Sequence, residues 1–103
     1  MEPQETKSWV VSCALEFTKQ LAAQELKGPY HCDLRDDHGH GRVASFEISD
    51  GKVVWFNWND NRVEVADYPL RLVVTSGDNE VRAAWIHERL WRPEDEPVAR
   101  VVR

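Results

Sequence analysis

The sequence predicts an α+β domain in which one N-terminal helix packs on an antiparallel meander sheet of four to six strands. Two observations support this fold class: a single helical segment opens the chain, and short β-prone runs separated by turn signals follow it. The chain has 103 residues, of which 42% are hydrophobic and 30% are charged. This size and composition predict one globular domain, 1–103, with a single core.

The helical segment extends from about Ser8 to Lys27, after residues 1–7, which we expect to form a frayed leader. Gly28 and Pro29 predict its end, because glycine accepts a left-handed conformation and proline cannot continue a helix. The β-branched run after Trp9 leaves open a short strand before the helix. Apolar side chains recur at the spacing of an amphipathic helix, at Val10, Ala14, Phe17, Leu21 and Ala22.

Residues 30–41 are predicted to form a polar connecting loop, because aspartates and two glycines interrupt any regular pattern. A metal site formed by His38, His40 and Asp36 is one hypothesis for this segment. The spacing matches no known metal-binding motif, so a solvated loop without a cofactor is the preferred interpretation. The segment contains seven side chains that can bind metal ions: His31, Cys32, Asp33, Asp36, Asp37, His38 and His40.

A hairpin is predicted over 42–58, with its turn at Asp50-Gly51. A two-residue turn pairs Ser49 with Lys52, whereas a three-residue loop pairs Ile48 with Lys52. The second register is preferred because it collects nearly all the large apolar residues on one face: Ala44, Phe46, Ile48, Val54, Phe56 and Trp58. The other face then carries Val43, Ser45, Glu47, Val53, Trp55 and Asn57, which leaves Trp55 outside the core.

Two further strands are predicted at 62–66, after a turn at 59–61, and at 70–75, where apolar and polar residues alternate. Near the end of the chain, residues 93–97 are expected to form an acidic linker bounded by prolines. This linker leads to residues 98–102, which are a candidate edge strand.

Residues 80–92 have helix propensity, but their apolar side chains scatter around a helical wheel, so a strand is the preferred interpretation. If a four-residue turn joins this strand to the preceding one, Thr75 pairs with Glu80. That register places six apolar residues on one face: Leu70, Leu72, Val74, Val81, Ala83 and Trp85.

Of the five tryptophans, Trp58 and Trp85 are expected in the core, whereas Trp55 and Trp91 are expected to anchor an interface. The sequence therefore predicts a non-enzymatic protein-binding module or inhibitor, because no catalytic motif is present. Its partner-binding surface is predicted to include Trp55, Glu47, Asn57, Asp60, Glu64 and Trp91. The alternatives are a metal-binding protein or metal-dependent enzyme using residues 31–40, and an obligate homodimer.

The formal net charge is −5 and no basic block exists, which argues against direct binding to nucleic acid and favours a protein partner with a basic surface. No apolar run is long enough to span a membrane, and the polar N-terminus lacks the apolar run of a secretory signal. We therefore expect a cytoplasmic protein without membrane contact. Cys13 and Cys32 are expected to be reduced thiols.

Overall fold

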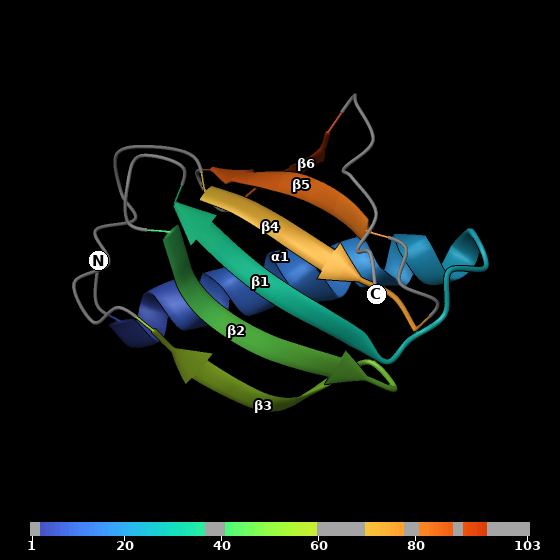
Figure 1. The fold of residues 1–103 in the computed structure, drawn as a ribbon, viewed down its shortest axis with the longest axis horizontal. Coiled ribbons are helices and arrows are strands. Elements are labelled where there is room, and N and C mark those ends of the chain that lie inside the picture. Colours follow the sequence, from blue (N-terminus) through green and yellow to red (C-terminus); the bar gives the residue numbers. More distant parts are fainter. Residues whose placement is uncertain (1–2, 37–40, 60–69, 78–80, 88–89, 95–103) are drawn as a thin grey trace.

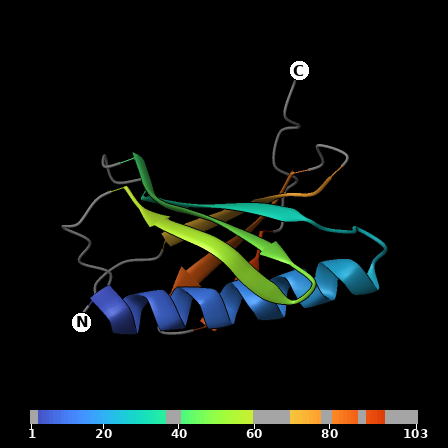
Figure 2. The same cartoon turned by 90° about the horizontal axis from the view of Figure 1, so that it is seen from below.

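The fold was determined from a computed structural model, which describes residues 3–36, 41–59, 70–77, 81–87 and 90–94. One helix lies across one face of a six-stranded antiparallel sheet (Figures 1 and 2). The predicted fold class, a helix packed on an antiparallel sheet, is confirmed. In chain order the elements are α1 (Pro3–Ala23), β1 (Tyr30–Asp36), β2 (Gly41–Ser49), β3 (Lys52–Trp58), β4 (Leu70–Thr75), β5 (Val81–His87) and β6 (Leu90–Pro93).

The sheet consists of two three-stranded meanders that lie side by side. The strand order is β3-β2-β1-β4-β5-β6, so β4 pairs with β1 instead of with the strand that precedes it in sequence. This order makes β1 a central strand and leaves β3 and β6 at the two edges (Figure 1). The strand predicted at 62–66 lies outside the described residues.

The prediction of a loop over 30–41 is wrong for its first half, because Tyr30–Asp36 is strand β1. Alternate residues of β1 are buried, including Cys32 and Leu34, whereas His31 and Arg35 reach the other face. This period-two alternation is a strand signal. It was obscured because the outward positions carry charged or ionisable side chains, which resemble loop composition.

Helix α1 begins five residues earlier and ends four residues earlier than predicted. The run after Trp9 is helical, because Trp9 and Val10 are buried against the sheet and tertiary packing outweighs β propensity. At the other end, Glu25 and not Gly28 adopts the left-handed conformation, with φ of 66°. The Leu26 N–H donates to the Leu21 carbonyl at 3.0 Å, which closes a Schellman-type cap.

The β2–β3 hairpin has the two-residue turn, followed by a change of register within the strands. Asp50 and Gly51 have φ of 53° and 75°, as a two-residue type I′ turn requires, and Ser49 pairs with Lys52. A β-bulge after Val53 then shifts the register by one residue, so that Phe46 pairs with Phe56. The preferred three-residue loop is therefore wrong. The predicted faces are correct for residues 44–48 and 55–58, whereas Val43 and Val53 pack with the core and not on the outer face as predicted.

Val54 is the extra residue of this bulge. It is 54% exposed, so its predicted place on the buried face is wrong. Beyond the bulge, the Phe56 ring stacks on the Phe46 ring with 5.1 Å between centroids. The Trp58 ring meets the Phe56 ring edge-on at 5.0 Å and packs partly buried against the core. The bulge thus gives both the favoured turn and the favoured core face to one hairpin.

The segment 80–92 is not one strand but the β5–β6 hairpin, although the preference for strand over helix is correct. Thr75 pairs with Val81 and not with Glu80, so the predicted register is wrong by one residue. Ala84 and Ile86 therefore face α1, and both are fully buried. Trp85 moves to the opposite face, where it is half-buried instead of lying in the core.

The core lies between α1 and one face of the sheet. That face carries four fully buried side chains: Leu34, Phe46, Leu72 and Ile86. The other face of the sheet, which we call the open face, is not covered by α1 (Figure 2). The linker predicted for 93–97 is described only at its start. Pro93 ends β6, and the Glu94 backbone N–H donates to the Ala83 carbonyl of β5 at 3.1 Å. Residues 95–103 lie outside the described residues.

Candidate functional site

The strand register arranges the side chains of the open face in rows that cross the sheet. Pairing between neighbouring strands fixes which side chains lie next to each other, because directly opposite residues have their Cβ atoms about 4.5–5.5 Å apart. The first row contains Trp55, Glu47, His31, Thr75 and Val81, and the second contains Asn57, Ser45, Asp33, Val73 and Ala83. Strands far apart in the chain thus contribute to one surface.

Asp33, on the central strand β1, is the centre of a polar network on this face. Its Oδ1 atom accepts a hydrogen bond from the Ser45 hydroxyl at 2.9 Å, and His31 Nε2 lies 3.2 Å from the same oxygen. Arg42 Nε approaches Oδ1 at 3.4 Å. Asp33 retains 19% side-chain exposure, compared with 43% for His31 and 59% for Arg42. The carboxylate therefore holds three neighbouring side chains in place near the surface.

The network continues to the end of β3. The Asn59 side-chain amide donates to the Ser45 hydroxyl oxygen at 3.4 Å, and the Asn57 amide donates to Asn59 Oδ1 at 2.8 Å. Asn59 is itself fixed by its backbone N–H, which donates to the Val43 carbonyl at 2.8 Å. These bonds order the polar surface on one side of Trp55.

Among the described residues, Trp55 is the largest exposed apolar side chain of the open face, with 42% of its surface accessible. Its ring contacts the His31 ring at 5.8 Å between centroids and a tilt of 47°. Glu47 lies directly opposite Trp55 in the β2–β3 ladder. An aromatic ring, a carboxylate and an imidazole therefore occupy adjacent positions at the edge of the sheet.

The network does not have the order of a nucleophilic triad. Ser45 is 7% exposed, and its hydroxyl donates to a carboxylate oxygen and not to an imidazole. Activation of a serine requires an adjacent general base that accepts its proton, with a third group orienting that base. The bonds from Ser45, His31 and Arg42 instead converge on one Asp33 oxygen, which is an arrangement that fixes side-chain positions.

Both cysteines lie on the core side, and both are free thiols, as expected. Burial raises the pKa of the Cys13 thiol to about 11. Burial also raises the pKa of Cys32, and the nearby carboxylates of Asp33 and Glu47 raise it further. Because the thiolate is the reactive form, these raised pKa values keep both thiols in their unreactive state near neutral pH.

The metal-site hypothesis for residues 31–40 falls largely outside the described residues, since His38 and His40 are not among them. Asp36 ends β1 and is buried. Within the described part of the chain, no three His, Cys, Asp or Glu side chains are grouped closely enough to hold a metal ion. In β1 the potential ligands are separated by the alternation of the strand, because Cys32 faces the core while His31 and Asp33 face the open side.

The predicted partner-binding residues divide into three groups. Trp55, Glu47 and Asn57 share the open face. Trp91 pairs with Ile86 on the helix side of the sheet, half-buried, with its ring 5.0 Å from the Phe17 ring, so it is not part of the same surface. The remaining two, Asp60 and Glu64, lie outside the described residues.

Four residues of the open-face network were not predicted as partner-binding residues: His31, Asp33, Arg42 and Ser45. Ser45 was placed on the correct face but without a partner. Recognising β1 as a strand next to β2 would have brought His31 opposite Glu47 and Asp33 opposite Ser45. The alternation within residues 30–36 was the available signal.

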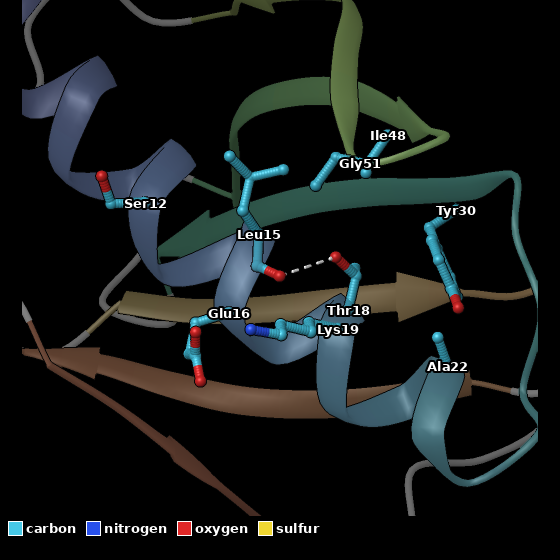
Figure 3. Close-up of a pocket in the computed structure, with 9 residues that line it drawn as sticks. All are labelled: Ser12, Leu15, Glu16, Thr18, Lys19, Ala22, Tyr30, Ile48 and Gly51. Atoms are coloured by element: carbon cyan, nitrogen blue, oxygen red, sulfur yellow. Dashed lines mark hydrogen bonds between the residues drawn. The ribbon is translucent and has the colours of Figure 1, made fainter.

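Two hollows lie beside α1 and at the β5–β6 hairpin, and the first is on the helix side of the sheet. A groove of about 560 Å³ separates α1 from the β2–β3 turn (Figure 3). Its inner surface includes Leu15, Tyr30 and Ile48, and Glu16 and Lys19 line it from the helix (Figure 3). A second hollow of about 520 Å³ lies at the β5–β6 hairpin and is lined by Trp85, His87, Leu90, Trp91 and Arg92.

Comparison of the chain with protein-family models, with curated proteins and with solved structures gives no match. Among the described residues, α1 is the only helix, and it lacks the apolar character needed to cross a lipid bilayer.

Proposed function

We propose that the protein is a non-enzymatic protein-binding module that contacts its partner through the open face, around Trp55, Glu47 and Asn57. The exposure of Trp55 carries this proposal, because 42% of the side chain is accessible on a sheet face that α1 does not cover. A tryptophan presents a large apolar area with only two rotatable bonds, and such side chains are frequent energetic anchors of protein interfaces.

The polar network beside Trp55 supports the same proposal. Hydrogen bonds fix Asp33, Ser45 and Asn57 in the free protein, so their side chains need little further ordering when a partner binds. Ordering a long side chain at an interface costs about 0.5–1.5 kcal/mol, which a pre-formed surface avoids. An ordered polar rim next to an exposed aromatic anchor is typical of a binding surface.

The expected partner has a basic surface. The net charge of −5 favours association with positively charged proteins and disfavours direct contact with nucleic-acid phosphates. We also propose a cytoplasmic location, which fits two unpaired cysteines in the core, because oxidising compartments favour disulfides.

The proposal is tested by photo-cross-linking in the cells from which the protein comes. A benzophenone amino acid replaces Val54, the 54% exposed neighbour of Trp55, in one variant and Gln20, which is exposed on α1, in the control variant. We expect a defined protein adduct from position 54 and none from position 20. Equal adducts from both positions, or none from position 54, would contradict the proposal, and an adduct between two copies of this chain would indicate a homodimer.

A further inference from the structure

Glu47 differs from the other carboxylate of the open face in its electrostatic environment. Asp33 is neutralised by Arg42 at 3.4 Å and contacts His31 at 3.2 Å. Glu47, by contrast, has no ion-pair partner anywhere in the described part of the chain, although it is half-buried beside the Trp55 ring. A partly shielded carboxylate next to an exposed indole is the combination that a cationic side chain would complement.

We propose that Trp55 and Glu47 together bind an arginine side chain of the partner protein, an inference that rests on the protein-binding function proposed above. The two residues are directly opposite each other in the β2–β3 ladder, so their side chains leave the sheet next to each other. A guanidinium group stacked on the indole can therefore reach the Glu47 carboxylate with its N–H donors.

Arginine fits this pair better than lysine does. Its guanidinium is planar, so it can stack on an indole ring while its edge donates two parallel hydrogen bonds to a carboxylate. A lysine ammonium is a compact, strongly hydrated charge and gains less from a flat aromatic surface. The other neighbour in the row, His31, contacts the Trp55 ring at 5.8 Å and limits how that ring can move.

The neighbouring cations do not occupy this position. Arg42 lies 3.4 Å from the Asp33 oxygen of the second row, and Arg71 binds Glu94 through Nε at 2.6 Å and through Nη2 at 3.1 Å. Among the described residues, the first row thus retains a carboxylate without an ion-pair partner, whereas Asp33 of the second row is paired. This difference selects the Trp55–Glu47 pair as the place where a cation of the partner would bind.

The test is an NMR titration of ¹⁵N-labelled protein with three short peptides that differ at one central position: arginine, lysine or citrulline. Citrulline has nearly the shape of arginine but no charge. We expect saturable shifts of the Trp55 indole N–H and the Glu47 amide, with affinity on the order of 1 mM for the arginine peptide and decreasing from arginine to lysine to citrulline. Glu47→Gln should weaken arginine binding about two- to fivefold.

Glu16→Gln removes an exposed carboxylate of α1 and is the matched control, which should bind the arginine peptide like the parent protein. Equal binding of the citrulline peptide, shifts located elsewhere on the surface, or equal weakening by both Glu variants would overturn the inference. A partner that cross-links at position 54 without any arginine-peptide binding would overturn this inference alone. Arginine binding at Trp55 without a cross-linked partner would support the cation site and contradict the protein-binding function.

Discussion

The bulge at Val54 gives the sharpest prediction, because it decides which side chains of β3 enter the core. We expect Val54→Lys to lower the free energy of unfolding by less than about 1 kcal/mol. Burying a whole valine side chain stabilises a protein by about 1.5 kcal/mol or slightly more, and a little under half of Val54 is shielded. The aliphatic part of the lysine replaces some of that contact.

Phe46→Ala is the reference substitution for a true core position. Phe46 is fully buried and stacks on Phe56 at 5.1 Å, so its truncation should cost about 3–5 kcal/mol. Both variants are measured by urea unfolding followed by circular dichroism, with the slope of the transition compared between them. In the register of a three-residue loop, which has no bulge, Val54 would share the face of Phe46 toward α1 and its lysine variant would bury a charge. A loss above about 3 kcal/mol for Val54→Lys would therefore refute the bulged register.

Three further predictions concern the thiols, the C-terminal ion pair and the turn. Cys13 and Cys32 should react with iodoacetamide at pH 8 much more slowly in the native protein than in urea, because burial raises both pKa values; equal rates would contradict this. Glu94→Gln should lower stability by about 1–3 kcal/mol in thermal unfolding, because it breaks a partly buried bidentate pair with Arg71, whereas an unchanged melting temperature would argue against that pair. Gly51→Ala should cost about 1–2 kcal/mol by the same measurement, since φ of 75° strains an L-residue; a neutral effect would exclude the type I′ turn.

The hairpin shows how far local sequence signals reach. Asp50-Gly51 correctly indicates a type I′ turn, and the apolar pattern correctly places Phe46 and Phe56 on one face. These two signals require registers that differ by one residue, and only a bulge satisfies both. The position of that bulge depends on how β3 packs on β2 and α1, which the order of residues in one strand does not specify.

The candidate site was predictable only in part for the same reason. Trp55, Glu47 and Asn57 follow from the hairpin alone, since all three lie within it. Predicting their neighbours on β1, His31 and Asp33, requires the pairing of β1 with residues 45–47. The interpretation of 30–41 as a loop excluded that pairing. Pairing between β1 and β4 joins segments about forty residues apart, and no turn signal near either strand indicates it.

The one-residue error between β4 and β5 had a similar origin. The predicted four-residue turn put Val81 and Trp85 toward the core, whereas the observed pairing puts Ala84 and Ile86 there. Apolar residues occur on both faces of β5, so hydrophobic pattern alone fits either register. Contact with α1 selects the observed register, because the fully buried Ala84 and Ile86 fill the space beneath the helix.

The central claim, that Trp55 serves a partner and not the core, is tested most directly by measuring stability and partner affinity on the same variant. Trp55→Ala is compared with Leu90→Ala, which truncates a 71% exposed residue at the other end of the sheet. We expect both variants to remain folded, with partner affinity lowered about tenfold or more only for Trp55→Ala. Unchanged affinity for Trp55→Ala, or its loss through unfolding, would contradict the claim.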